Sequence, residues 1–258
     1  FLLLSVAAIL LVQRRTFTGD RARWAGVLLG VILVVDFARA NAPWIKYYDY
    51  RDKYASNPVV DFLRQQPFEH RVAILPFRVN QEMSILQQIY NVEWLQHLFQ
   101  YYGIQAIDVV QEPRTLVENQ TDRSLWTNTN VLAQWQPGNP IVRQWQLTNV
   151  RYLLGLAGMA EALNQQLDPV HRRFQVKLPF DFPNLRMGNF STVQTNATGP
   201  FALIEFTGAL PRAKLYDQWQ VSTNDQATLD QLAGPQLDPA RVVLVAGEVA
   251  LSPASVAT

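Results

Sequence analysis

The sequence predicts an α+β fold in which two N-terminal transmembrane helices precede a mixed α/β extracytoplasmic domain. Two observations support this prediction. Two apolar runs, residues 1–13 and 24–40, flank a short loop, residues 14–23, that holds four arginines and a single aspartate. Patterns typical of short helices and strands then alternate along residues 58–258, as they do in α+β domains.

The arginine-rich loop determines the predicted orientation. Short loops rich in arginine stay on the cytoplasmic side of a membrane, so we expect the residues after the second run to lie on the extracytoplasmic side. The first run begins with Phe1 instead of a methionine and is interpreted as part of a longer transmembrane helix. It lacks the basic start and the small-residue cleavage site of a signal peptide.

Aromatic residues mark both ends of the second run. Trp24 stands at its start, and Trp44, Tyr47 and Tyr48 follow its end, as in the aromatic belts at membrane interfaces. A helix from Trp24 to Trp44 would rise about 30 Å, which is roughly the thickness of one hydrocarbon core. The uninterrupted apolar run ends at Val35, and on length alone this favours a core helix. A soluble hairpin of two core helices therefore remains the alternative.

Composition excludes several classes of function. The chain has 22 basic and 21 acidic residues and a formal net charge of +1, and no basic stripe interleaved with aromatic residues follows the arginine loop, so we expect no nucleic-acid partner. There is no cysteine, which excludes disulfides and thiolate metal sites. No phosphate-binding glycine loop or nucleophile elbow is present, and we expect no cofactor.

A juxtamembrane connector, residues 41–57, links the second run to the domain. Several short stretches in the domain have helix or strand patterns. Helices are predicted at residues 58–66, 81–103, 224–234 and from residue 141, and strands within residues 70–77, 104–111, 150–156, 172–178, 201–208, 212–222 and 241–247. The helix at 81–103 is expected to bury Ile85, Ile89, Val92, Leu95 and Phe99, which recur every three or four residues, and to end at Gly103. The segment from Glu112 to Pro140 is polar and turn-rich.

Two small groups of charged residues are candidates for chemistry. Glu93 and His97 lie four residues apart on the predicted helix and could share a metal ion or act as an acid–base pair. No third ligand is near in sequence, and His70 and His171 are interpreted as solvated, so a surface helix pair is the preferred interpretation and no metal site is predicted. Asp49 and Asp52 with Lys53 could hold a cation or a phosphate, but a solvated connector is preferred.

Longer stretches resemble the C-terminal region of bacterial YfhO-like membrane proteins. The stretches contain the patterns L-x-N-V-R-Y-L-L, A-L-P-R-A and D-P-x-x-V-V-L of that family, which here occupy Leu147–Leu154, Ala209–Ala213 and Asp238–Leu244. The resemblance covers nearly the whole chain, in the same order. It implies a multi-pass protein of the bacterial cytoplasmic membrane, similar to glycosyltransferases of the GT-C type that take a sugar from a polyprenyl-phosphate carrier.

The resemblance places the catalytic acid of such enzymes in an early extracytoplasmic loop outside this sequence. The chain is therefore interpreted as a non-catalytic segment whose domain is cut before a final β-rich domain, and no catalytic residue is predicted. If the protein handles a polyprenyl-phosphate sugar, Lys46, Arg51 and Lys53 would hold its phosphate beside the aromatic belt; general attraction to anionic headgroups is the simpler role. The expected partners are the bilayer, that carrier and a cell-envelope acceptor. The alternative function is a membrane-anchored binding or structural module without transferase activity.

Overall fold

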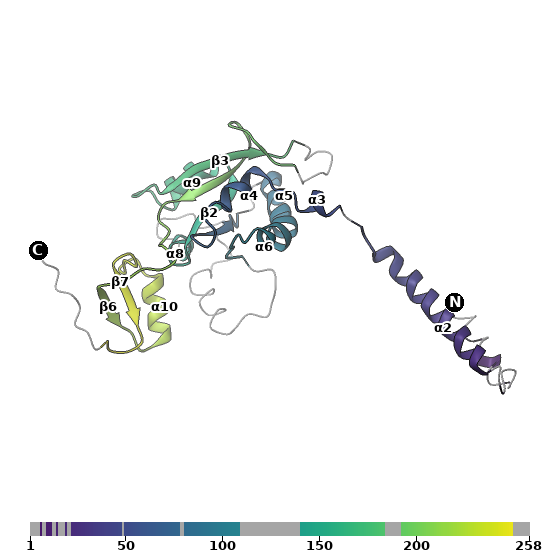
Figure 1. Ribbon diagram of the computed structural model, residues 1–258. Coiled ribbons are helices and arrows are strands. Elements are labelled where there is room, and N and C mark those ends of the chain that lie inside the picture. Colours follow the sequence, from purple (N-terminus) through teal and green to yellow (C-terminus); the bar gives the residue numbers. More distant parts are fainter. Residues whose placement is uncertain are drawn as a thin grey trace, which may run out of the picture. The chain divides into compact units, whose positions relative to one another are not determined.

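The computed structural model describes residues 6, 9–11, 14, 19, 22–47, 49–77, 80–108, 140–183 and 192–249. The chain divides into two compact units, Phe1–Lys53 and Tyr54–Thr258, and each is described by itself. Figure 1 shows the helices and strands of both units.

The first unit consists mainly of one long helix. Helix α2 covers Ala22–Asn41, a 3₁₀ turn η2 follows at Ala42–Trp44, and a single turn α3 covers Tyr50–Lys53. Within the described residues one stretch, Gly26–Trp44, is long and apolar enough to cross a membrane. Of the first apolar run, residues 1–13, the structure describes residues 6 and 9–11, which are helical; a second transmembrane helix stays a prediction.

The second unit is built on a five-stranded mixed sheet, which confirms the predicted α+β class. The strands are β1 (Arg71–Ile74), β2 (Val150–Leu156), β3 (Phe174–Asp181), β4 (Gln194–Thr195) and β5 (Phe201–Phe206). Their order across the sheet is β1-β2-β5-β3-β4; β1 and β2 are parallel and the other pairs are antiparallel. Every residue of β5 is buried, so the centre of the sheet is the centre of the core.

Side-chain caps explain where several helices begin. The helices of this unit are α4 (Pro58–Leu63), α5 (Gln81–Ile89), the π-helix η3 (Tyr90–Leu98), α6 (Phe99–Tyr101), α8 (Pro140–Leu147), α9 (Met159–Gln166) and α10 (Asp225–Ala233). Asn57 accepts hydrogen bonds from the backbone amides of Val59 and Val60 at 3.1 and 3.0 Å, and Pro58 follows it at the first helical position. Asn80 and Asn224 cap α5 and α10 in the same way, which satisfies amides that a helix start leaves open.

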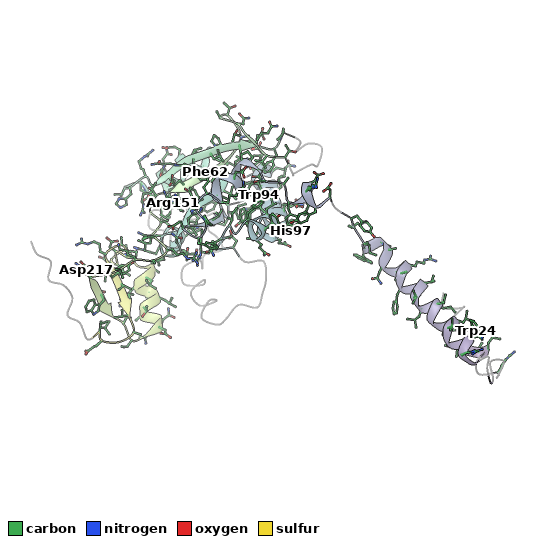
Figure 2. All side chains as sticks on the ribbon, viewed as in Figure 1. Trp24, Phe62, Trp94, His97, Arg151 and Asp217 are labelled. Carbon is green, nitrogen blue, oxygen red and sulfur yellow. The ribbon has the colours of Figure 1, made fainter. Side chains whose placement is uncertain are left out.

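Helices pack on both faces of the sheet. Phe201 and Phe206 are five residues apart in β5, so their side chains point to opposite faces. The ring of Trp94 from η3 lies 6.1 Å from Phe180, which stacks on Phe201, whereas Trp145 from α8 lies 6.5 Å from Phe206. Aromatic packing of this kind contributes both buried apolar area and orientation. Figure 2 labels Trp94 together with Phe62, an α4 residue whose ring meets the edge of Tyr152.

The π-helix changes which residues of the 81–103 segment are buried. The predicted apolar face holds for Ile89, Leu95 and Phe99, but Val92 is exposed and the prediction for it is wrong. The fully buried positions Leu86, Tyr90, Trp94 and Leu98 instead recur every four residues. A π-helix has more residues per turn than an α-helix, so an α-helical period assigns the wrong side chain to the core. The segment ends as predicted at Gly103, whose φ is +68°.

A second, two-stranded sheet follows the main one. Strands β6 (Gln218–Val221) and β7 (Val242–Val245) are parallel, and α10 connects them. Between residues 207 and 249 only Leu237 and Pro239 are buried. This part of the chain therefore has little core of its own.

Most predicted elements are confirmed; the strand predicted at 104–111 is an exception, and α3, β4 and α9 are additional elements that no pattern predicts. Of the strand predicted at 104–111, the described residues 104–108 form a single parallel bridge between Ala106 and Val72. Helix α9 follows a segment whose glycines, Gly155 and Gly158, predict a turn and no helix. The segment from Glu112 to Pro140 lies outside the described residues apart from Pro140 itself, which begins α8.

Candidate functional site

The most unusual feature of the first unit is the apolar surface of α2. Trp24, Val34 and Phe37 are 61%, 68% and 59% exposed, and none of the stretch Gly26–Trp44 is buried. Figure 2 shows Trp24 near the start of this helix. The exposed apolar side chains include Val31, Leu33, Val34 and Val35, whereas Leu29 and Ile32, one turn apart on one side of the helix, are half-buried. A helix with so much apolar surface is normally buried, either in the core of a protein or in the lipid of a membrane.

The predicted phosphate contacts lie in the connector after α2. Lys46 and Arg51 are exposed and Lys53 is half-buried. Arg51 and Lys53 belong to the single turn α3, and Lys46 precedes it in irregular backbone. The structure thus places these cations within eight positions of one another along the chain.

Asp49 has a structural use that the sequence did not reveal. Its side chain accepts a hydrogen bond from the backbone amide of Arg51 at 2.8 Å, and its carbonyl oxygen accepts one from the amide of Lys53 at 2.8 Å. Both bonds cap the turn α3. This capping supports the interpretation of Asp49 as part of a solvated connector over its use as a cation ligand.

In the second unit, a buried carboxylate lies between two half-exposed cations. The side chain of Glu205 in β5 is 8% exposed, and it accepts contacts from Arg151 at 2.7 Å and from Lys177 at 3.3 Å. Both cations occupy β-bulges. Arg151 has no partner between the pairs Arg71–Val150 and Val72–Tyr152, and Lys177 has none between Val176–Ile204 and Leu178–Leu203. Because a bulge re-aims the side chain of its extra residue, both side chains turn toward Glu205.

The charges in this cluster stabilise one another. Burial would raise the pKa of Glu205, but hydrogen bonds from Arg151 and Lys177 outweigh it and hold this pKa below the ordinary value of 4.5. The bond to Glu205 also raises the pKa of Arg151. The cluster thus stays ionised at neutral pH and fixes both bulges; Figure 2 labels Arg151.

His70 is buried, which corrects the prediction that it is solvated. It is 5% exposed, its ring meets the edge of Tyr152 at 4.7 Å, and Nδ1 has no hydrogen-bond partner. Burial and the positive charge of Arg151 lower the pKa of His70 from 6.5. No local pattern indicates this burial, because the ring packs against Tyr152 of β2, a strand far from His70 in the sequence. His171, in contrast, is exposed as predicted.

Glu93 and His97 both lie on η3 and are half-buried; His97 is labelled in Figure 2. Among the residues that the structure describes, no group of three or more His, Cys, Asp or Glu side chains could hold a metal ion. The described side chains therefore offer this pair no third ligand.

The three stretches that carry the family resemblance have structural roles. Asn149, with a φ of +60°, donates its side-chain amide to the carbonyl of Leu210 at 2.6 Å, which joins the first stretch to the second. Arg212 donates to the carbonyl of Phe68 and to the side chain of Gln105. In the third stretch, the Asp238 side chain accepts from the amide of Ala240 at 2.9 Å and so shapes the turn before β7.

A polar pocket lies where the first two stretches meet. Its volume is about 300 Å³, and it is lined by Gln66, Glu69, Asn149, Arg151, Phe206, Thr207, Ala209, Leu210 and Pro211. The Oδ1 atom of Asn149 is buried and has no hydrogen-bond partner. Carboxylate, amide, hydroxyl and guanidinium groups thus converge in one hollow that can bind a small polar molecule.

Comparison of the chain with protein-family models, curated proteins and solved structures gives no match. The resemblance to the YfhO-like family therefore remains a hypothesis that rests on the sequence stretches alone.

Proposed function

We propose that α2 anchors the chain in a membrane and holds the sheet unit at its extracytoplasmic surface. The observation that carries this proposal is the apolar surface of α2, which is exposed on most sides of the helix, with no residue of Gly26–Trp44 buried. Exposed apolar area of this extent is unfavourable in water by about 25 cal/mol per Å². Hydrocarbon removes that cost, and an α-helix satisfies its own backbone hydrogen bonds there.

The proposal extends to the whole protein. The chain would be the C-terminal part of a multi-pass protein of the bacterial cytoplasmic membrane that resembles transferases of lipid-linked sugars. Its sheet unit would bind and position the acceptor, a cell-envelope polymer, and the catalytic groups would come from other segments. Lys46, Arg51 and Lys53 follow the exposed Trp44 and would contact the phosphate of the carrier at headgroup depth.

A second candidate is a membrane-anchored binding module that transfers nothing. It is supported by the pairing of charged side chains in the sheet unit: Glu205 holds Arg151 and Lys177, and Asp168 holds Arg173 at 2.7 Å. These charges stabilise the fold. The polar pocket beside Asn149 serves either candidate.

Single cysteines test the membrane orientation, because the chain has no cysteine of its own. Thr18→Cys lies in the arginine loop, and Thr223→Cys lies at an exposed position after β6. An impermeant thiol reagent added to intact cells should label Thr223→Cys, and Thr18→Cys only after the cells are opened. Labelling of Thr18→Cys alone would reverse the orientation, and recovery of the chain in the soluble fraction would overturn the anchor.

A further inference from the structure

A second cavity lies in the sheet unit, on the side of α8. Its volume is about 340 Å³, and its lining comes from α8, from the segment between α9 and β3, and from the end of α10: Val142, Arg143, Gln146, Leu167, Asp168, Pro169, Val170, His171, Arg173, Ala233 and Pro235. Three of these side chains, Arg143, His171 and Arg173, are basic, whereas Asp168 is the only acidic one.

The carboxylate of Asp168 is fully used by Arg173. It accepts from Nε of Arg173 at 2.7 Å, from a terminal nitrogen at 3.1 Å and from the backbone amide at 3.0 Å. Such a two-pronged pair satisfies both partners. Asp168 thus has little capacity left to neutralise a second cation in the cavity.

Arg143 is the arginine of this cavity that is not paired with Asp168. Its guanidinium group is half-buried and donates to two neutral oxygens, the side chain of Gln146 at 3.2 Å and the carbonyl of Gly234 at 3.3 Å. No described carboxylate lies within 4.0 Å of the guanidinium group. Asp238 acts on it only by electrostatic attraction at longer range. Burial lowers the pKa of Arg143 and outweighs the charge of Asp238, which raises it, and the nearby Arg173 lowers it further, as expected of a partly buried cation that has no carboxylate in contact.

We propose that this cavity binds a small oxyanion, a phosphate or carboxylate group, which the guanidinium of Arg143 holds. The fork of an arginine side chain matches two oxygens of either group. The exposed His171 lines the same cavity and offers ring nitrogens that can hydrogen-bond to an anion. The site is independent of the membrane anchor, and a cavity of this size takes one small molecule.

Calorimetric titration of the full chain in detergent tests the proposal. The probes are inorganic phosphate and glucuronate, with glucose as a neutral control of the same ring size. Phosphate or glucuronate should bind and glucose should not. Arg143→Gln should weaken binding about tenfold or more, whereas Arg241→Gln, an exposed arginine outside the cavity, should leave it unchanged. Binding of phosphate alone or of glucuronate alone identifies which oxyanion the site takes.

A second variant covers the case in which Arg143→Gln does not fold. His171→Glu puts a negative charge beside the cavity at an exposed position, so the fold should tolerate the substitution. The added charge should repel the anion and lower its binding affinity. His171→Gln is its matched control and should retain most of the affinity. The proposal is overturned if neither anion binds, if glucose binds equally well, or if folded Arg143→Gln binds the anion with unchanged affinity. Where Arg143→Gln does not fold, unchanged affinity in His171→Glu overturns it.

Discussion

The hydroxyl group of Tyr90 donates a hydrogen bond of 2.5 Å to Oδ2 of Asp108, and the same oxygen accepts from the backbone amide of Ile74 at 3.1 Å. One carboxylate therefore joins three segments: the first residue of η3, the segment beside the main sheet, and the end of β1. Burial and the charge of Asp108 raise the pKa of Tyr90 well above 10.0. The hydroxyl keeps its proton and remains a donor.

Tyr90→Phe removes this donor and should lower the free energy of unfolding by about 1.5–3 kcal/mol, the range for hydrogen bonds to charged groups. Urea denaturation monitored by circular dichroism measures the change. Tyr101→Phe is the matched control, because Tyr101 is half-exposed and lies 11 residues away. If both variants lose equal stability, the Tyr90–Asp108 bond has no special role.

The Glu205 cluster should make stability depend on acid. Because the pKa of Glu205 is lowered in the folded chain, its contribution is complete above the unfolded value of about 4.5 and is lost as pH falls through the folded pKa. Glu205→Gln should cost about 1–2 kcal/mol at pH 7, since Arg151 and Lys177 are half-exposed and partly screened. The difference in the free energy of unfolding between the unmodified chain and Glu205→Gln should decrease below about pH 4.5. Glu248→Gln, at an exposed position, should show neither effect.

His70 should act in a higher pH range. Its pKa is lowered in the folded chain, so the unfolded chain binds the proton more tightly. The contribution of neutral His70 to the free energy of unfolding should be fully present above about pH 6.5. On acidification this free energy should fall by at most about 1.4 kcal/mol per pH unit until the folded pKa is reached. His70→Gln should abolish this slope, and His171→Gln should keep it. A slope that is the same in all three proteins would assign it to another group.

Two glycines should respond in opposite ways to alanine. A Cβ at Gly199 would lie 2.4 Å from the carbonyl oxygen of Phe180, and the backbone there has no room to give. A Cβ at Gly158, at the start of α9, would meet nothing within 4 Å. Gly199→Ala should therefore cost about 1–3 kcal/mol, and Gly158→Ala should be neutral or stabilising by up to about 1 kcal/mol. Thermal unfolding compares the two, and equal stability would contradict the β4–β5 turn geometry.

The connector prediction rests on the proposed membrane function. In the complete protein, Arg51→Gln combined with Lys53→Gln should lower turnover at limiting donor, with insertion and thermal stability unchanged. General attraction to anionic lipid, about 1 kcal/mol per cation, would instead reduce membrane affinity and leave turnover intact. Arg23→Gln, in the arginine loop, removes one cation before the anchor helix and should leave donor use unchanged. Unchanged turnover in the connector variant would remove these residues from the donor site.

Local signals in the sequence predicted most of the elements. Asn57–Pro58 indicates the start of α4, and Asn224 or Asp225 together with Gly234 indicates the limits of α10, because caps act over a few residues. The burial of His70 depends on Tyr152, and the bulges that turn Arg151 and Lys177 toward Glu205 depend on strand register. These are contacts between distant segments, so no local pattern encodes them. The prediction for Val92 is wrong for another reason. The rule that apolar residues recur every three or four positions assumes an α-helix, and Val92 lies in a π-helix.

The sparse core around β6, α10 and β7 has a consequence for dynamics. A region with so few buried residues opens at lower free energy than the centre of the main sheet, so within the sheet unit we expect α10 to open before the buried strand β5. Ala233 and Pro235, at the end of α10, form one wall of the Arg143 cavity. An anion bound in the Arg143 cavity would favour the form in which α10 is folded. Binding of the anion and folding of α10 would then be thermodynamically linked.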